Sequence, residues 1–305
     1  MDQKKKYHFI AIGSSATYHL AVALRQLGHT ITTSDEQISP DVHSKLVELN
    51  LLPQASGWQP DKMDKSLDGV IIGIQANRSN PELLKAQQLG LKVHTVPEFI
   101  YEFARNKQRL VVVGTSGRTE IASMIVHVLK SMTRPVDYVL SDERQDSIHL
   151  SDAPLIVIDG SESRSSAVYH TPQFIRYKHH IGVMSEVEYD PKGALSENDF
   201  IRQFDLFADG TPKGGILIYW EQDKIASVIS NKERADVLYI PYKAHPSAAE
   251  GTKEFMVNHK KEHIAVSFSG KKAFIHVSAA FEALKKIGVL PEQFYKAIAT
   301  YDGIK

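Results

Sequence analysis

The segment from Gly114 to Glu120 reads GTSGRTE and stands between an apolar run, RLVVV, and a helical pattern, IASMIVHVLK. Loops that cradle phosphate use backbone N–H groups of a glycine-rich turn, a lysine for the terminal phosphates and a hydroxyl for Mg²⁺. Here Gly114 and Gly117 supply the turn and Thr119 the hydroxyl, but Arg118 takes the place of the lysine. The flat guanidinium on its long stem does not replace a compact ammonium ion. The loop therefore predicts a phosphate site with altered chemistry.

A second candidate site begins at Gly13, which ends the apolar run YHFIAIG, and includes Asp35. A glycine turn, a helix N-terminus for phosphate and a later carboxylate for a ribose form the layout of a dinucleotide-binding fold. The loop GSSAT has a single glycine, so the side chains of Ser14, Ser15 and Ala16 hinder close approach of a pyrophosphate. The missing glycines argue against the alternative of an NAD-linked dehydrogenase. Anion binding at the free N–H groups of the helix start remains possible.

Strand and helix patterns alternate along the whole chain. Apolar runs predict strands. In each half of the chain, the first such run ends in glycine and is followed by a helical pattern. Such alternation predicts α/β architecture, with parallel sheets covered by helices on both faces. Residues 106–108 form a polar break, so we expect two domains, 1–107 and 108–305. Trp58 and Trp220 are single aromatic residues that we expect to pack in cores.

The composition is that of an average globular protein, with 305 residues, 42% hydrophobic and 24% charged. Lysine plus arginine equals aspartate plus glutamate at 36 each, so no overall field favours nucleic acid or an anionic membrane. There is no cysteine, which excludes disulfides and thiol catalysis and suits a reducing compartment. No run approaches the roughly 20 apolar residues that span a bilayer. We therefore expect a cytoplasmic protein without nucleic-acid or membrane partners.

At these motifs the sequence resembles the Mur ligases, ATP-dependent enzymes that add amino acids or peptides to UDP-N-acetylmuramate. Their loop reads G-T-x-G-K-T-T/S, which GTSGRTE matches except at the lysine and the last hydroxyl. The first residues, HFIAIGSSATYHL, are similar to H-F-I-G-I-G-G-x-x-M of the UDP-N-acetylmuramate–L-alanine ligase and murein peptide ligase branch. NPELLKAQQLGLKV, followed by PEFIYE, matches that family's N-P-E-L pattern.

The resemblance covers essentially the whole chain and implies its domains. Residues 1–107 are expected to form a Rossmann-like domain that binds the UDP sugar, and residues 108–305 a P-loop-type central domain like the ATPase domain of the Mur ligases. The closing FYKAIATYDGIK resembles the hinge before a third domain, which we expect to be absent because the chain ends at Lys305.

The resemblance also implies a mechanism that uses ATP and Mg²⁺. ATP phosphorylates the muramyl carboxylate to an acyl phosphate, and an amine then displaces phosphate. In this chain Thr119 and Asp159 would hold Mg²⁺, and Arg118, Asp159 and Asp190 would be catalytic if the protein is active. The implied nucleotide contacts are Gly114, Thr115, Gly117, Arg118, Thr119, Lys272 and His276.

Several of these positions depart from the family pattern, which puts ATP and Mg²⁺ in doubt here. The replacements are Arg118, Glu120, Ser161, Pro191, Lys272, Ala273 and His276. Loss of a single electrostatic stabiliser of a transition state costs about 10²–10³ in rate, so several losses predict little ligase activity. Arg118, Lys272 and Arg164 could instead build a new anion site, although solvated surface cations are the simpler expectation.

By the resemblance, the first domain contacts the sugar nucleotide through Gly13, Ser14, Ser15, Asp35 and Asn80. We therefore predict a Mur-ligase-like protein of peptidoglycan metabolism that binds UDP-N-acetylmuramate or a muropeptide, with impaired catalysis. Its partner would be a true ligase. The alternative is an active ATP-dependent ligase whose third domain is missing from this chain or supplied by another one.

Overall fold

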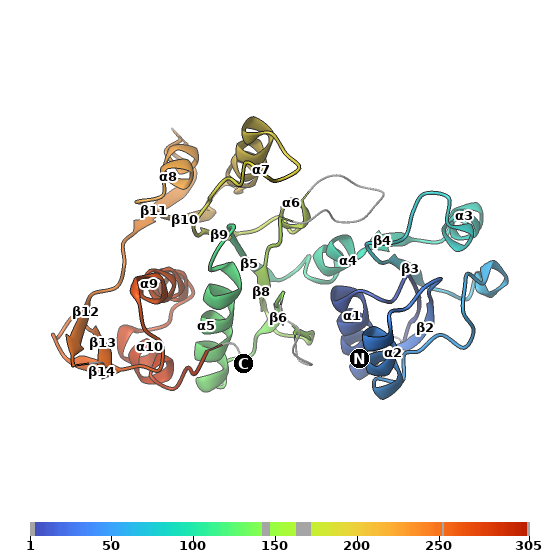
Figure 1. Ribbon diagram of the computed structural model, residues 1–305, viewed down its shortest axis with the longest axis horizontal. Helices are drawn as coiled ribbons and strands as arrows, with labels where there is room; N and C mark the ends of the chain where they lie inside the picture. Colours follow the sequence, from blue (N-terminus) through green and yellow to red (C-terminus); the bar gives the residue numbers. More distant parts are fainter. Residues whose placement is uncertain (1–3, 142–146, 163–171, 233, 252, 304–305) are drawn as a thin grey trace. The chain divides into compact units, whose positions relative to one another are not determined.

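The computed structural model describes residues 4–141, 147–162, 172–232, 234–251 and 253–303, which fall into two compact units (Figure 1). The first unit takes the described residues within Met1–Arg105, Glu143–Asp152 and Ser163–Arg176. The second takes those within Asn106–Asp142, Ala153–Glu162 and Tyr177–Lys305. Each unit is built around its own parallel sheet, so the predicted α/β class is confirmed.

The first unit has a four-stranded parallel sheet in the order β2-β1-β3-β4. The strands are β1 (Lys6–Ile10), β2 (Thr30–Ser34), β3 (Gly69–Ile72) and β4 (Val93–Thr95). The other elements are α1 (Ser15–Gln26), α2 (Pro40–Glu48), η1 (Pro60–Lys62), α3 (Pro81–Gln88), α4 (Val96–Phe103), β7 (Ile148–His149) and α6 (Gln173–Arg176). The order reverses at β1, and ligands of open α/β sheets bind where such a reversal leaves a crevice beyond the strand ends.

Local sequence fixes where two of these helices begin. The Asn80 side chain caps α3 by accepting N–H donors from Glu82 and Leu83, each at 3.0 Å. At α4, Thr95 and Glu98 form a capping box, in which each side chain binds the other residue's backbone N–H. Caps of this kind satisfy N–H groups that have no partner inside the helix.

The turn after β1 depends on Gly73, which directly follows the neighbouring strand β3. β1 is shorter than the apolar run predicted, because Ala11 adopts a left-handed conformation with φ of 59°. The carbonyl of Ala11 then lies so close to Gly73 that a Cβ on Gly73 would stand 2.1 Å from its oxygen. Gly73 also donates its N–H to Ile10 at 2.8 Å. The first loop therefore reaches its position only because residue 73 has no side chain.

The second unit has a parallel sheet in which β11, β10, β9, β5, β8 and β6 follow one another. These strands are β5 (Gln108–Val113), β6 (Asp137–Val139), β8 (Leu155–Asp159), β9 (Ile181–Met184), β10 (Ile216–Trp220) and β11 (Leu238–Tyr242). The helices are α5 (Arg118–Ser131), α7 (Glu197–Asp209), α8 (Lys224–Ser230), α9 (Lys271–Lys286) and α10 (Pro291–Ile298). A small antiparallel sheet contains β12 (Ser247–Glu250), β13 (Lys253–Val257) and β14 (His263–Ala265).

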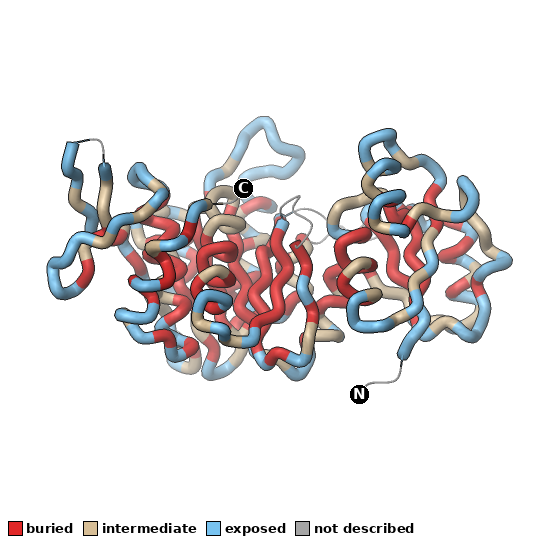
Figure 2. Tube along the Cα trace, turned by 90° about the horizontal axis from the view of Figure 1, so that it is seen from below, coloured by how far each residue is buried: buried red, intermediate tan, exposed pale blue. Residues whose placement is uncertain are grey.

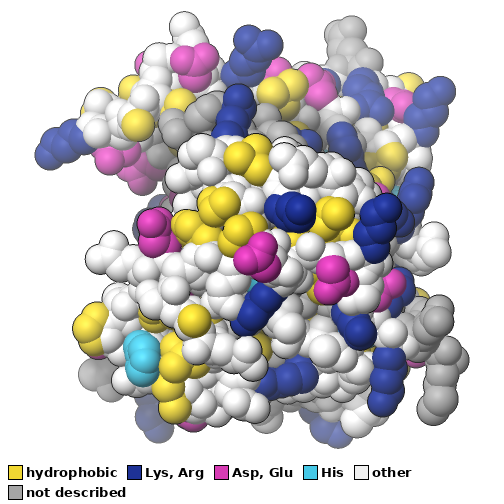
Figure 3. Space-filling view, turned by 90° about the vertical axis from the view of Figure 1, so that its right-hand side faces the viewer, with side chains coloured by type: hydrophobic (Ala, Val, Ile, Leu, Met, Phe, Trp, Pro, Cys, Tyr) yellow, Lys and Arg dark blue, Asp and Glu magenta, His cyan; other side chains and the backbone are white. Residues whose placement is uncertain are grey.

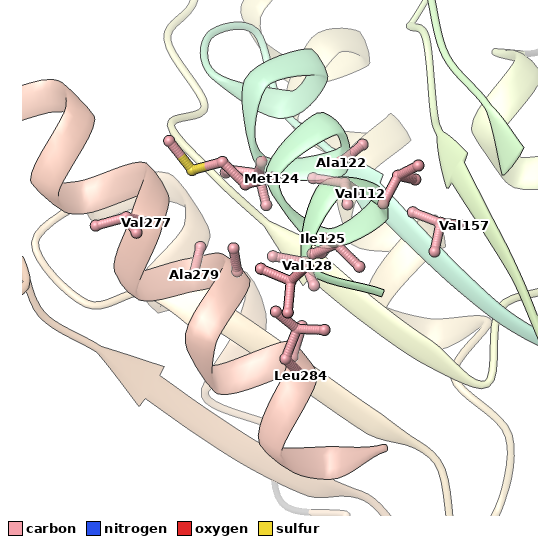
Figure 4. Packing of buried hydrophobic residues seen from close by; sticks show 14 of the residues in the cluster. Val112, Ala122, Met124, Ile125, Val128, Val157, Val277, Ala279 and Leu284 are labelled. Atoms are coloured by element: carbon pink, nitrogen blue, oxygen red, sulfur yellow. The ribbon is translucent and has the colours of Figure 1, made fainter. Parts of the chain in front are cut away.

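Helices α5, α9 and α10 lie on one side of this sheet and α7 and α8 on the other (Figure 1). Met124, Ile125 and Val128 of α5 pack beside Ala279 and Leu284 of α9, with the strands beneath them (Figure 4). The strands of both units form the buried core in Figure 2. Burial of such side chains contributes about 1.5–3 kcal/mol each, so the contact between α5 and α9 is firmly held.

The surface carries charges of both signs. In the face shown in Figure 3, basic and acidic side chains are interspersed with small groups of hydrophobic ones. Among the helices of the described residues, none is both long and apolar enough to cross a membrane.

The contact at Gly73 gives a stability prediction. Gly73→Ala should lower the free energy of unfolding of the first unit by about 2–4 kcal/mol, because the new Cβ would overlap the Ala11 carbonyl. Gly90→Ala is the control, since Gly90 has φ of 69° with open space around it and should cost only about 1 kcal/mol. Chemical denaturation measures both. Equal losses would show that the close approach of Ala11 does not matter.

Candidate functional site

A cavity of about 550 Å³ lies in the first unit, at the carboxyl ends of its strands. Its lining comes from the turn after β1, the segment after β2, one residue after β3 and one tryptophan. These residues are Ala11, Gly13, Asp35, Glu36, Gln37, Ile38, Ser39, Pro40, Trp58 and Gln75. The cavity occupies the point where the strand order reverses, which is the expected ligand position in this class of sheet.

The Asp35 carboxylate organises the turn beside this cavity. Its Oδ2 accepts the Gly13 N–H at 2.9 Å, and its Oδ1 accepts the Gln37 N–H at 3.0 Å. Burial raises the pKa of Asp35 above its ordinary value, against the opposing effect of these N–H donors. A Cβ on Gly13 would stand 3.1 Å from the carboxylate, so a glycine suits the contact. Gly13 and Asp35 are thus brought together, as the dinucleotide-like spacing predicts.

The other residues predicted for the sugar nucleotide lie in different settings. Ser14 and Ser15 are half-buried at the start of α1, where the Ser14 hydroxyl bonds Thr17 and that of Ser15 bonds His19. Asn80 is buried and caps α3, so its side-chain oxygen is already engaged. Trp58 packs against the core of the first unit, as expected, and also lines the cavity. A lone aromatic residue outside any strand or helix pattern carried no signal of this role.

In the second unit, the segment after β9 holds the Gly114–Glu120 loop in place. The Thr115 N–H donates to the Glu186 carbonyl at 2.8 Å, and the Ser185 hydroxyl donates to the Ser116 carbonyl at 2.6 Å. A Cβ on Gly114 would stand 2.0 Å from the Ser185 hydroxyl oxygen. The loop therefore keeps its glycine-dependent geometry, and α5 begins directly after Gly117, whose φ is 78°.

Three predicted residues meet at the end of β8. The Arg118 Nε lies 3.1 Å from Oδ1 of the buried Asp159, and the Thr119 hydroxyl donates to Oδ2 at 2.6 Å. The Ser141 N–H also donates to Oδ2, at 3.1 Å. Burial raises the pKa of Asp159, and the neighbouring guanidinium opposes this shift. Glu162 adds a second carboxylate 3.5 Å from the Arg118 Nε.

A second cluster covers the start of α5. The buried His276 of α9 places its Nδ1 2.5 Å from the Glu120 carboxylate, while its Nε2 lies 3.7 Å from that of Glu186. Lys272 forms an ion pair with the same Glu186 oxygen at 3.5 Å. A Cβ on Gly117 would stand 2.1 Å from the His276 Nε2, so the imidazole lies directly against the turn. The packing of α9 on α5 fixes this arrangement.

These contacts do not fit Mg²⁺ and ATP. The guanidinium of Arg118 faces the carboxylate that would hold the metal, and Thr119, the other predicted ligand, donates to that carboxylate. Around the loop, the described contacts set the carboxylates of Glu120, Asp159, Glu162 and Glu186 against the permanent cations Arg118 and Lys272. Like charge next to a triphosphate is unfavourable.

The remaining predicted residues lie apart from these clusters. Asp190 is exposed, and its carboxylate accepts the Lys192 N–H at 2.9 Å within a turn. Arg164 lies outside the described residues. Among the residues that the structure does describe, no three His, Cys, Asp or Glu side chains converge as ligands for a metal ion. Glu186, which sequence reasoning missed, contacts both His276 and Lys272.

Comparison with known proteins shows which class the chain is similar to. A family model described as the Mur ligase family, catalytic domain, matches residues 6–108. Solved structures of this class share the fold of nearly the whole chain. A UDP-N-acetylmuramate:L-alanyl-γ-D-glutamyl-meso-diaminopimelate ligase from Neisseria meningitides superimposes with a TM-score of 0.84 and 19% identity, over 99% of this chain and 100% of that one. The chain is therefore similar to the Mur ligases in sequence and shares their fold.

Individual ligases show how far the likeness extends. A UDP-N-acetylmuramate–L-alanine ligase from Caldicellulosiruptor bescii is 24% identical over 98% of this chain and 67% of its own length. The Escherichia coli UDP-N-acetylmuramate–L-alanyl-γ-D-glutamyl-meso-2,6-diaminoheptandioate ligase is 25% identical over 72% of this chain and 49% of its own length. The chain thus spans between about half and two thirds of these relatives. The resemblance to this branch, stated from the motifs, is confirmed.

The Arg118–Asp159 pair gives a second prediction. Arg118→Met should destabilise the second unit by about 3 kcal/mol, because it leaves a buried carboxylate without its cation. The pKa of Asp159 would rise further above its unfolded value. The folded state would then bind the proton more tightly, so stability should fall more steeply as the pH rises from about 4 towards 7.

The double variant Arg118→Met/Asp159→Asn is the matched control for this pair. It removes both charges and should recover most of the lost stability and the added pH dependence. Denaturation curves at several pH values measure the stability of both variants. A double variant as unstable as Arg118→Met would mean that the arginine contributes through something other than the carboxylate.

Proposed function

We propose that this chain acts in muropeptide metabolism by binding a UDP-N-acetylmuramate-type ligand in its first unit, with ATP-dependent ligation impaired. The observation that carries the proposal is the pairing of Arg118 with Asp159. A guanidinium takes the place of the metal charge, so the carboxylate has a charge partner without Mg²⁺. The relatives' names include UDP-N-acetylmuramate ligases, which supports the ligand class.

The first unit keeps features that suit a sugar nucleotide. Its cavity of about 550 Å³ falls within the range of ligand sites and combines an aromatic face, Trp58, with a buried carboxylate, Asp35. A carboxylate that accepts ribose hydroxyl protons is common in nucleotide-binding folds of this topology. The start of α1, at Ser14 and Ser15, offers backbone N–H groups to a phosphate. We assign the uridine and its phosphates to this cavity and this helix start.

The second unit keeps the fold of a nucleotide-binding domain but not its charge pattern. Glu120 and His276 close the turn at Gly117, where backbone N–H groups of a phosphate loop would otherwise face an anion. Each of Lys272 and Arg118 lies beside a carboxylate. We infer a structural role for this loop and a binding or regulatory role for the protein, acting beside a true ligase.

Calorimetric titration tests both halves of the proposal. We expect binding of UDP-N-acetylmuramate in the micromolar range and no heat from Mg²⁺–ATP at the same concentrations. Tight binding of Mg²⁺–ATP, with turnover on a muramyl substrate, would instead support an active ligase that needs a further domain. No heat from either ligand would overturn the assignment of the sugar nucleotide.

Restoring the family's residues supplies a gain-of-function test. The variant Arg118→Lys/Glu120→Thr/His276→Asn removes the guanidinium from Asp159 and the imidazole from Gly117, so it should acquire measurable Mg²⁺–ATP binding. Arg118→Lys alone is the control, because it retains the Glu120–His276 pair over the turn. It should show no measurable binding of Mg²⁺–ATP. Binding by the single variant would show that the pair does not close the site.

The Asp35 carboxylate gives a matched test in the first unit. Asp35→Asn should raise the Kd for UDP-N-acetylmuramate by roughly tenfold or more, since hydrogen bonds to a charged acceptor are worth about 1.5–3 kcal/mol. Asp64→Asn is the control, because that carboxylate binds the exposed Ser66 and does not line the cavity. Calorimetry measures both variants, and an unchanged Kd for Asp35→Asn would remove this residue from the site.

A further inference from the structure

We propose that Glu82 is the positioning residue of the first unit's cavity, because its one carboxylate fixes two of the chain segments that line it. The inference rests on the proposed function, which assigns this cavity to the sugar nucleotide. Glu82 does not line the cavity itself. It acts through the residues next to Asp35 and Trp58.

The Glu82 carboxylate is fully buried at the start of α3 and is surrounded by donors. Its Oε1 accepts the Gln59 N–H at 2.6 Å. Its Oε2 accepts the Ser34 hydroxyl, and the His8 Nε2 lies 3.4 Å from the same oxygen. The Asn80 cap fixes the backbone of Glu82 in turn, with its Oδ1 3.0 Å from the Glu82 N–H nitrogen. One side chain therefore joins β1, β2, α3 and the segment before η1.

Two of those partners are next to cavity residues in the chain. Ser34 immediately precedes Asp35, and Gln59 immediately follows Trp58. Neighbouring Cα atoms are about 3.8 Å apart across a rigid peptide, so a shift of Ser34 or Gln59 is passed on to the cavity residue. The carboxylate thus sets the distance between the aromatic face and the acidic group that a ligand would contact.

Only a charged acceptor suits both oxygens. The donors from His8, Ser34 and Gln59 outweigh burial and hold the pKa of Glu82 below its ordinary value. A glutamine of the same size would turn an NH₂ group towards the Gln59 N–H or towards the Ser34 and His8 side. In the first orientation the Gln59 N–H would lack an acceptor, and in the second the Ser34 hydroxyl and the His8 imidazole would have to change from donor to acceptor. In either case the segments that carry these groups would move. Supporting contacts of this kind decide whether a binding geometry is held closely enough to function.

The test compares Glu82→Gln with Glu98→Gln in the full chain. Glu98 also stands in the first turn of a helix of the same unit, where it accepts from Thr95, but it does not line the cavity. Both variants should lose some thermal stability. Glu82→Gln should also raise the Kd for UDP-N-acetylmuramate roughly tenfold by calorimetry, and Glu98→Gln should leave it unchanged.

A second measurement reports on the surroundings of Trp58 in the cavity without any ligand. The chain has two tryptophans, so incorporation of 5-fluorotryptophan gives two ¹⁹F resonances, and Trp58→Phe assigns them. Glu82→Gln should shift the Trp58 resonance and leave that of Trp220, in the core of the second unit, in place. A merely structural loss, as in Glu98→Gln, moves neither. If Glu82→Gln does not fold, Ser34→Ala replaces it in the test. This variant removes one donor and keeps the carboxylate, so it should produce the same changes to a smaller extent.

The outcomes separate this inference from the proposed function. Wild-type protein that binds the sugar nucleotide, with Glu82→Gln binding equally well, overturns the positioning role and leaves the function standing. Wild-type protein that does not bind overturns the function, and the Trp58 resonance then decides the inference. A shift specific to Glu82→Gln supports the positioning role for a cavity with another ligand, and an unmoved resonance overturns it.

Discussion

A buried carboxylate needs a positive or hydrogen-bonding partner, and the candidate site of the second unit depends on how Asp159 obtains one. It receives the Thr119 hydroxyl, the Ser141 N–H and the charge of Arg118. Because water cannot solvate this oxygen pair, removing a partner is far more costly than making the contact is favourable. A metal ion can supply that charge only while it is bound, whereas an arginine supplies it permanently. Arg118 thus supplies Asp159 with a positive charge from within the chain.

The need of a carboxylate for a partner also applies at the neighbouring turn, which ends at Glu120. Glu120 replaces a hydroxyl and would repel phosphate, yet in this chain it has a partner in His276, another replaced position. The two side chains pair with each other, so each has a partner at the half-buried turn. Lys272 and Glu186 extend the pairing. Substitutions that look like scattered losses in the sequence therefore form one consistent set of contacts in the structure.

The fold was largely predictable from the sequence, and the sites only in part. Apolar runs that end in glycine marked the central strands, because parallel strands are buried on both faces. Short or half-exposed elements such as α8 and β12 went unpredicted, since they carry little periodicity. The spacing singled out Gly13 and Asp35, and the motifs singled out Arg118, Thr119 and Asp159, and the structure brings the members of each set into contact. Trp58 and Glu186 were not singled out as site residues, because their roles arise from contacts between segments distant in sequence.

The two units also differ in what their buried acids do. In the second unit, ion pairs within the chain give Asp159 and Glu120 a charge partner at the loop itself. In the first unit, Glu82 is satisfied behind the cavity, while Asp35 lines it and accepts backbone N–H groups of Gly13 and Gln37. A carboxylate held by backbone donors keeps lone pairs for hydroxyl groups of a ligand. This difference in the partners of the buried acids supports the proposal that the first unit recognises a ligand.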